Sequence, residues 1–432
     1  MTLLKVMLPR VLVGLALFAA SGCSSEGGGG GPAGGASGVS GASGTAGASA
    51  GGGGTSGTSG ASGVGGVAGA GAAAAAGAGG GAGSAGAGGQ VAMVEGPRWV
   101  GRVDASDPNA VRFGWQGAGF VSGVEGSSIA VRLRTEGTDT VYFQPVIDGE
   151  PGARFPVDSG ADREVLLASG LGAGQHLVEL YRETEGMYGV STFLGFSQGQ
   201  PTLTPAATDR FIEVVGDSIS AGYGNLGSEP HPNWVADPAC HWTAENSSWY
   251  ASYAAVAGRA LGAEVSTIAR SGAGMYRDLG GSTTNVLSAV YGLALGSTVA
   301  EPWDFAREPS AVLINLGTND WASGDPGVAF ETSYVDFIAQ LRSHYPNAWI
   351  FLLTGSMLGG TALSQAQARL ESVIATVTAT TGDTRLATVA LGTQDLGADG
   401  SIPSGCDWHP SAAEHLRMAG VLQQELAAHL GW

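Results

Sequence analysis

The sequence predicts two folded domains behind a long N-terminal segment: an all-β jelly-roll sandwich at residues 91–200 and an α/β domain at residues 205–432. Three observations support this expectation. Residues 99–198 form short alternating apolar runs broken by turn residues, and residues after 200 alternate strand-like with helix-like patterns. Residues 27–89 contain only Gly, Ala, Ser, Thr, Val and Pro. Such a segment has too little apolar side-chain mass to fold alone, so residues 23–90 are predicted to be a flexible linker.

The N-terminus has the pattern of an export signal. An apolar stretch at 11–20 follows Lys5 and Arg10 and ends in Ala-Ser-Gly-Cys23. It is too short to span a bilayer and has the charged and apolar regions of a signal peptide. It also resembles a bacterial lipoprotein signal, which would be residues 1–22 here, cleaved before an acylated Cys23. We therefore expect an exported protein anchored to a membrane at the cell envelope or surface; an ordinary signal peptide with an incidental cysteine is the alternative.

Charge and cysteine content narrow the classes of partner. The net charge of -18 and the pI near 4.6 argue against nucleic acid as a ligand. If Cys23 is lipidated, Cys240 and Cys406 remain, and an oxidising compartment would allow them to form a disulfide. A metal site built from Cys240, His241 and His231 lacks the spacing of known zinc motifs, so we expect no metal.

The first folded domain has the residue pattern that is typical of antiparallel strands. Alternating runs occur at 128–133, 141–147 and 175–181. Asp148 and Gly149 follow the second run and are a typical hairpin turn pair. No stretch in this region has a convincing helical period, which favours a jelly-roll-like sandwich.

The second domain alternates strands with helices. Buried-strand patterns occur at 211–215, 264–268, 311–316 and 349–354, and helical patterns at 248–261, 334–344, 363–380 and 411–429. This alternation predicts a parallel sheet with crossover helices. In open sheets of this kind, sites form at the carboxyl ends of the strands.

Polar turns at these strand ends contain the parts of a serine hydrolase. Ser218 follows the first strand in a tight Gly-Asp-Ser turn and is the candidate nucleophile, which needs a base to take its proton. His409, in a polar loop before the last helix, is the candidate base. Asp407 lies two residues earlier, and in an extended segment both side chains would project to the same side. Its carboxylate would then orient the imidazole.

Two further turns offer donors for a developing oxyanion. Asn319 lies just beyond the strand at 311–316 and has a side-chain amide. Gly272 follows the strand at 264–268 and can offer a backbone NH at close approach. With the NH of Ser218, they would form an oxyanion hole.

These turns resemble the SGNH hydrolases, a family named for its Ser, Gly, Asn and His. The resemblance is carried by 212–225 (IEVVGDSISAGYGN), 271–277 (SGAGMYR), 314–320 (INLGTND) and 406–411 (CDWHPS). It is closer still to carbohydrate esterase family 2, whose members join a jelly roll to a flavodoxin-like, three-layer SGNH domain. The run 176–186 (HLVELYRETEG) is similar to a jelly-roll strand of that family. The resemblance covers about residues 97–430.

One position departs from the broader SGNH pattern. The acidic residue usually stands three residues before the histidine, and here that position is Cys406. In family 2, an aspartate two residues before the histidine can fill the role, and some members are thought to use a backbone carbonyl. Both arrangements remain open for Asp407.

The resemblance implies a monomeric enzyme without metal or cofactor that removes O-acetyl groups from plant polysaccharides such as xylan or glucomannan. The reaction would proceed through an acetyl-enzyme intermediate on Ser218. Trp321 and Trp408 are candidate stacking surfaces for sugar rings, and core packing is an equal alternative for both. Two other functions stay open: an SGNH esterase for a lipid or thioester, and a tethered glycan-binding protein.

Overall fold

The computed structural model describes residues 92–230, 237–296 and 299–432. All of them belong to one compact unit, Ser84–Trp432. The predicted signal peptide, the lipidation site Cys23, the linker at 23–90 and His231 lie outside the described residues, so these expectations remain predictions.

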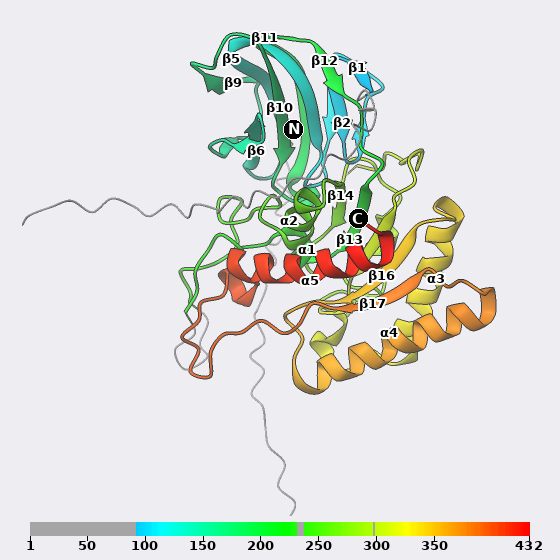
Figure 1. Cartoon of the computed structure of the whole chain (residues 1–432). Coiled ribbons are helices and arrows are strands. Elements are labelled where there is room, and N and C mark those ends of the chain that lie inside the picture. The colour runs from blue at the N-terminus through cyan, green and yellow to red at the C-terminus, as the bar shows by residue number, and fades with distance from the viewer. Residues whose placement is uncertain (1–91, 231–236, 297–298) are drawn as a thin grey trace, which may run out of the picture. The chain divides into compact units, whose positions relative to one another are not determined.

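The first part of the described chain is an antiparallel β-sandwich (Figure 1). Its strands are β1 (Met93–Glu95), β2 (Arg98–Val100), β3 (Val103–Asp104), β4 (Val111–Phe113), β5 (Gly119–Gly137), β6 (Val141–Ile147), β7 (Glu150–Pro151), β8 (Phe155–Val157), β9 (Arg163–Ser169), β10 (Gln175–Arg182), β11 (Gly189–Pro201) and β12 (Leu203–Pro205). The first half of β5 pairs with β2 and β10, and its second half pairs with β9. Fully buried apolar side chains, among them Phe113, Phe120, Phe143 and Leu180, fill the space between the layers.

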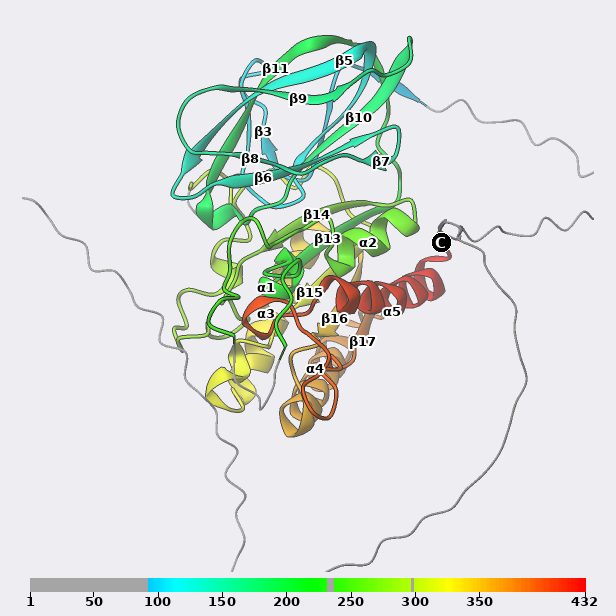
Figure 2. The ribbon, with the colours of Figure 1, turned by 90° about the vertical axis from the view of Figure 1, so that its left-hand side faces the viewer.

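The second part is a five-stranded parallel sheet with helices on both faces (Figure 2). Its strands are β13 (Phe211–Gly216), β14 (Glu264–Ala269), β15 (Ala311–Asn315), β16 (Trp349–Thr354) and β17 (Leu386–Ala390), in the order β14-β13-β15-β16-β17. Its helices are α1 (Ser218–Ala221), α2 (Tyr253–Ala260), α3 (Val328–His344), α4 (Gly360–Thr381) and α5 (Ala412–Leu430). This flavodoxin-like order reverses direction between β13 and β15, and ligands bind at such a switch point.

The two faces of the sheet are covered by different helix pairs because successive strand side chains point to opposite sides. Val215 packs with residues of α3 and α4, and its neighbour Val214 packs with residues of α2 and α5. Both side chains are fully buried. The three-layer α/β fold expected from the sequence is therefore present.

Most element bounds agree with the sequence patterns, with four differences. Strand β17 was not expected from the sequence, because its buried positions are interrupted by exposed ones. Helix α2 begins only at Tyr253, five residues after the helical pattern at 248–261 begins, and α3 begins at Val328, six residues before the pattern at 334–344. The sandwich strands continue to Pro205, whereas the sandwich was predicted to end at residue 200.

Buried polar contacts join the sandwich to the α/β domain. Arg102, between β2 and β3, is fully buried, and its Nη2 lies 3.2 Å from Oε2 of Glu213 in the central strand β13. The hydroxyl of Tyr291 donates to the other oxygen of Glu213 at 2.6 Å. The side chain of Gln116 donates to the carbonyl of Ala269, at the end of β14, at 3.0 Å. The two domains therefore share a polar, buried junction.

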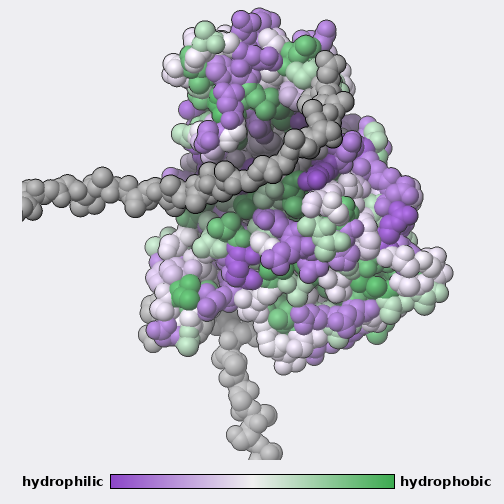
Figure 3. Space-filling model, in the orientation of Figure 1, coloured by the Kyte–Doolittle hydropathy of each residue, from purple (hydrophilic) through white to green (hydrophobic). Residues whose placement is uncertain are grey.

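On the face seen in Figure 3, apolar residues are scattered among hydrophilic ones. The most exposed large apolar side chains, Val328, Leu416 and Leu166, belong to α3, α5 and β9. Single exposed side chains of this kind are ordinary on a protein surface. Within the described ranges, no helix has both the length and the apolar character needed to cross a bilayer.

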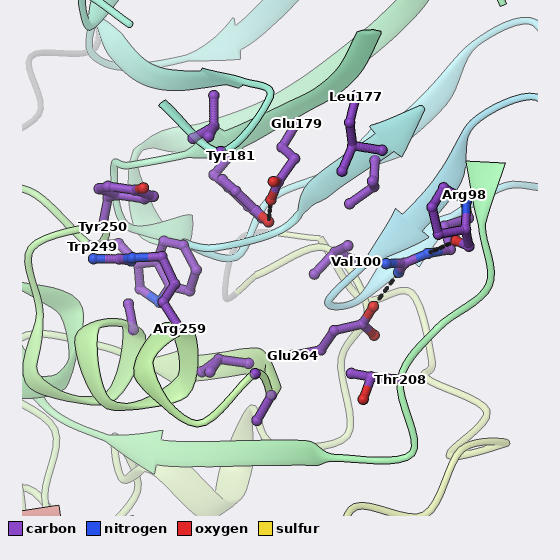
Figure 4. Close-up of a pocket in the computed structure, with 18 of the residues that line it drawn as sticks. Arg98, Val100, Leu177, Glu179, Tyr181, Thr208, Trp249, Tyr250, Arg259 and Glu264 are labelled. Carbon is purple, nitrogen blue, oxygen red and sulfur yellow. Dashed lines mark hydrogen bonds and ion pairs between the residues drawn. The ribbon is translucent and has the colours of Figure 1, made fainter. Parts of the chain in front are cut away.

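A cavity of about 360 Å³ lies between the sandwich and the α/β domain. Figure 4 shows Arg98 paired with Glu264 on one side and Tyr181 bonded to Glu179 on the other. Glu264 begins β14, so this cavity reaches the amino end of that strand rather than the carboxyl end, where the predicted catalytic turns lie. None of the predicted site residues lines it.

Candidate active site

The predicted nucleophile Ser218 lies directly after the central strand β13. It is 6% exposed and is the first residue of α1. The side chain of Asp217 caps this turn by accepting a hydrogen bond from the NH of Ile219 at 3.0 Å, and burial raises the pKa of Asp217 to about 7. A Cβ at Gly216 would lie 2.1 Å from Oγ of Ser220, so the tight turn requires glycine there.

The predicted base His409 is hydrogen-bonded to Ser218. Its Nε2 lies 2.7 Å from the Ser218 Oγ, although 191 residues separate the two in the chain. The ring of Tyr223 stacks on the imidazole, with centroids 4.1 Å apart. Burial lowers the pKa of His409 to about 4, so the imidazole is neutral at pH 7 and able to accept the Ser218 proton.

The other imidazole nitrogen meets the main chain of Asp407 and not its carboxylate. The His409 Nδ1 lies 3.0 Å from the carbonyl oxygen of Asp407. The expectation that the Asp407 carboxylate orients the imidazole therefore differs from the structure. The expectation assumed an extended segment, but Asp407 has a left-handed backbone, with φ 52° and ψ 41°, which turns its side chain away from the imidazole.

The carboxylate of Asp407 instead anchors the loop that carries His409, called the catalytic loop below. It accepts hydrogen bonds from the hydroxyl of Tyr223 at 2.7 Å and the NH of Trp242 at 3.0 Å, and it lies 2.9 Å from Nδ1 of His241. Partial burial raises the pKa of Asp407, but the hydrogen bonds from His241, Tyr223 and Trp242 outweigh it and hold that pKa below its ordinary value. A left-handed backbone conformation raises the free energy of a residue that has a side chain, and the contacts of the Asp407 carboxylate offset that free energy.

A disulfide links the same two segments. Cys240 and Cys406 are bonded, with Cα atoms 4.9 Å apart. Cys240 precedes His241, and Cys406 precedes Asp407, so the bond holds the loop at 240–242 beside the histidine loop. Neither cysteine is available as a metal-ligating thiolate. Across the described ranges, no group of three or more His, Cys, Asp or Glu side chains is arranged to hold a metal ion.

The two predicted oxyanion donors follow β14 and β15, the strands that flank β13 in the sheet. Gly272 has φ 78°, a conformation that favours glycine, after β14. Asn319 follows β15 and is 7% exposed. Its Nδ2 donates to the carbonyl of Ala273 at 2.8 Å, and its contact with Oδ2 of Asp217 is a weak 3.5 Å. One amide hydrogen thus ties Asn319 to the Gly272 loop, and the second has no strong partner among the contacts described.

The two candidate sugar-stacking residues differ in their surroundings. Trp321 is 7% exposed and packs edge-on against Phe330, within the core beneath α3. Of the two alternatives for Trp321, the structure agrees with core packing and not with sugar stacking, because its ring is buried by neighbouring side chains. Trp408 is partly exposed and directly precedes His409, so its predicted role stays open.

Sequence reasoning assigned no role to three aromatic residues near the catalytic loop. Tyr223 stacks on His409, as described above. Trp242 stacks on Tyr188 of the sandwich, with centroids 4.1 Å apart, and its ring lies 6.3 Å from that of Tyr223. The sequence signals were the position of Tyr223 five residues after Ser218 and that of Trp242 two residues after Cys240.

Comparison with known proteins gives matches to both domains. Residues 99–206 match the family model described as carbohydrate esterase 2 N-terminal, and residues 214–417 match the GDSL-like lipase/acylhydrolase family. The cellulase/esterase CelE of Acetivibrio thermocellus is 35% identical over 336 residues, which are 77% of this chain and 39% of CelE. The chain therefore spans well under half the length of that relative.

Two further relatives match over most of their length. An acetylxylan esterase / glucomannan deacetylase of Cellvibrio japonicus is 26% identical, over 77% of this chain and 88% of the relative. The structure of a family two carbohydrate esterase from Clostridium thermocellum, in complex with cellohexaose, is 34% identical with a TM-score of 0.71. That alignment covers 78% of this chain and 100% of the other. On its sequence, its two-domain fold and these matches, the chain belongs to carbohydrate esterase family 2.

Proposed function

We propose that this esterase removes O-acetyl groups from plant polysaccharides, such as xylan or glucomannan, through an acetyl-enzyme on Ser218. The observation that carries the proposal is the 2.7 Å contact between Nε2 of His409 and the Ser218 Oγ. A neutral imidazole in that position is the base that a serine nucleophile requires. The acetylxylan esterase relative supports the choice of acyl group and ligand.

The reaction follows from these positions in two halves. His409 Nε2 takes the proton of Ser218 as its Oγ bonds to the acetyl carbon, and the carbonyl oxygen becomes an oxyanion. The NH groups of Ser218 and Gly272 and the amide of Asn319 are the proposed donors to that oxygen. The bond between the acetyl carbon and the sugar oxygen then breaks, and the imidazolium gives its proton to that oxygen, which leaves as the sugar hydroxyl. His409 next takes a proton from water, whose oxygen bonds to the acetyl carbon. The bond between that carbon and the Ser218 Oγ breaks, acetate leaves, and the imidazolium returns a proton to the Oγ.

Acetate release from a panel of acetylated xylan, glucomannan and cellulose tests this proposal. We expect release from wild type and none from the Ser218→Ala variant, which should keep the wild-type circular dichroism spectrum. A panel of p-nitrophenyl esters of increasing chain length tests for a lipid-type acyl preference. An optimum at acetyl supports the proposal, whereas a long-chain optimum or equal acetate release by both proteins would contradict it.

We further propose that the enzyme is exported and held at a membrane by a lipid on Cys23. Residues 1–22 have the pattern of a lipoprotein signal peptide, which supports this proposal. Residues 23–90 would then link the lipid to the folded domains. A disulfide between Cys240 and Cys406 fits an oxidising compartment. Labelling cells with a palmitate analogue should mark the wild type and not Cys23→Ser. Equal labelling, or a soluble wild type after cell fractionation, would contradict the anchor.

A further inference from the structure

The carboxylate of Glu185, in the sandwich, reaches the loop that carries Gly272. Glu185 lies between β10 and β11 and is 3% exposed. Its Oε2 accepts a hydrogen bond from the backbone NH of Ser271 at 2.7 Å, and its Oε1 accepts one from the Ser271 hydroxyl at 2.5 Å. A single side chain from one domain thus fixes both the main chain and the side chain of a residue in the other.

Glu185 is itself rigidly held. The fully buried guanidinium of Arg182 donates to the carbonyl of Thr184 at 2.8 Å, to the carbonyl of Glu185 at 3.1 Å and to the Ser191 hydroxyl at 2.6 Å. Burial lowers the pKa of Arg182 to about 9, so the group remains charged at neutral pH. These bonds leave the backbone around Glu185 little freedom to move.

Ser271 directly precedes Gly272, the proposed source of an oxyanion NH. The peptide that joins the two residues contains this NH, so its direction depends on how Ser271 is held. Beyond Gly272, the loop is tied by the Leu279 NH, which donates to the Gly272 carbonyl at 2.9 Å, and by Asn319 on Ala273. Before Gly272, the bonds to Glu185 tie Ser271 itself.

We propose that Glu185 is a positioning residue for the oxyanion hole, acting through Ser271 to aim the Gly272 NH at the developing charge. The inference rests on the proposed function, because it assumes that an ester oxygen becomes an oxyanion at Gly272. Catalysis of acyl transfer depends on donors fixed in advance, and a misplaced donor weakens the transition state more than the bound ester. The sandwich is then part of the catalytic apparatus.

The test uses the full-length enzyme with p-nitrophenyl acetate, a substrate that has no sugar. Active sites are counted by labelling Ser218 with a fluorophosphonate, so that kcat refers to folded, reactive protein. Removal of a whole oxyanion donor typically lowers kcat about 10²- to 10³-fold. Because Glu185→Ala leaves the donor present but loosely held, we expect kcat to fall about ten- to a hundredfold, with KM within about threefold of wild type.

Two other variants separate positioning from general stability. Glu185→Gln keeps an acceptor for the Ser271 NH and a polar group for its hydroxyl, so we expect kcat within about threefold of wild type. Glu183→Ala is the matched control. Glu183 is also a buried carboxylate of the sandwich, but it accepts from the Tyr250 NH at 3.2 Å, in a different loop. We expect this variant to lower Tm and leave kcat per labelled site unchanged.

Each result has a defined meaning. A kcat for Glu185→Ala equal to wild type, or an equal fall in Glu183→Ala, would overturn the positioning role. If Glu185→Ala does not fold, Glu185→Asp replaces it. That variant keeps the carboxyl group but withdraws it by one methylene, so its kcat must fall below that of Glu185→Gln, and equal values would overturn the inference. A wild type that neither cleaves the ester nor takes the label would contradict the proposed function itself.

Discussion

Nδ1 of His409 lies 3.0 Å from the main-chain carbonyl oxygen of Asp407, and the Asp407 carboxylate is bonded elsewhere. The imidazole is therefore oriented by a neutral peptide dipole. A carbonyl fixes the tautomer as a carboxylate does, since it accepts the Nδ1 proton, but it stabilises the imidazolium less.

The first prediction concerns Asp407. Replacement of the orienting aspartate in a Ser-His-Asp triad lowers kcat about 10⁴-fold. Because the carbonyl remains in Asp407→Asn, and asparagine tolerates left-handed backbone, we expect a loss of only about tenfold or less in kcat on p-nitrophenyl acetate. A loss near 10⁴-fold would show that the carboxylate itself acts on His409. Asp407→Ala, which removes all three anchoring contacts, should be slower than Asp407→Asn.

The second prediction concerns Tyr223, which contacts both His409 and Asp407. Tyr223→Phe keeps the ring on the imidazole and loses the hydroxyl bond to Asp407, so we expect kcat to fall only a few-fold, in line with one hydrogen bond of about 1 kcal/mol. Tyr223→Ala loses the ring as well and should be slower by at least a further tenfold. Similar kcat values for the two variants would contradict a role for the stacked ring.

The third prediction is a pH profile. An unperturbed histidine titrates at about 6.5, but burial lowers the pKa of His409 to about 4. A base with a lowered pKa stays deprotonated to lower pH, so the acid limb of kcat/KM should lie well below 6.5. Burial also raises the pKa of Glu185 and of Asp217 to about 7, so a separate limb near pH 7 would report one of these carboxyl groups. Glu185→Gln removes the titration of Glu185 and should keep the limb of His409. A titration of the His409 imidazole itself at or above pH 6.5, followed by the NMR signals of its ring protons, would contradict a buried base.

The fourth prediction concerns the disulfide. It closes a loop of 166 residues, for which the chain-entropy model gives a stabilisation of roughly 5 kcal/mol. The double variant Cys240→Ser/Cys406→Ser should unfold at lower urea concentration and lose activity, because only hydrogen bonds then hold the loop with His241 and Trp242 to Asp407. An unchanged midpoint, or a wild-type protein that contains two free thiols, would contradict this.

The fifth prediction separates the two tryptophans. Trp321→Ala should lower the free energy of unfolding by about 3–5 kcal/mol, the usual cost of emptying a core aromatic site. Trp408→Ala should raise KM for acetylated xylan about two- to tenfold, as expected from the loss of one aromatic contact, and leave KM for p-nitrophenyl acetate unchanged. If Trp321→Ala changed KM for acetylated xylan and left the free energy of unfolding unchanged, Trp321 would be a substrate-binding residue and not a core residue.

The sequence was informative wherever local pattern decides structure. Strands β13, β15 and β16 are mostly apolar and buried on both faces, with Glu213 the one charged residue among them, so their sequences predict strands without reference to their partners. Strand β17 has exposed positions at Thr388 and Ala390 and gives no such signal. The contact of Ser218 with His409 was predicted from the residue types and their motifs and not from strand ends, because His409 lies in the loop between β17 and α5.

The sequence did not predict features that depend on a rare backbone conformation or on contacts between residues far apart in the chain. The direction of the Asp407 side chain depends on a left-handed backbone conformation. The types of the neighbouring residues do not predict that conformation. The contact between Glu185 and Ser271 joins residues 86 positions apart on different domains. Trp321 follows a polar turn, as a surface residue would, but α3 covers it. In each case tertiary packing, rather than local pattern, sets the outcome.

The buried pair of Arg102 and Glu213 has a consequence for the evolution of this architecture. An α/β domain without its sandwich would keep Glu213 inside its central strand with no cation beside it, and breaking a buried pair in this way typically costs about 3–5 kcal/mol. Duplication or recombination that separated the two halves would thus yield a marginal protein. Unlike modules joined by a linker, these domains are expected to be inherited, exchanged and truncated only together.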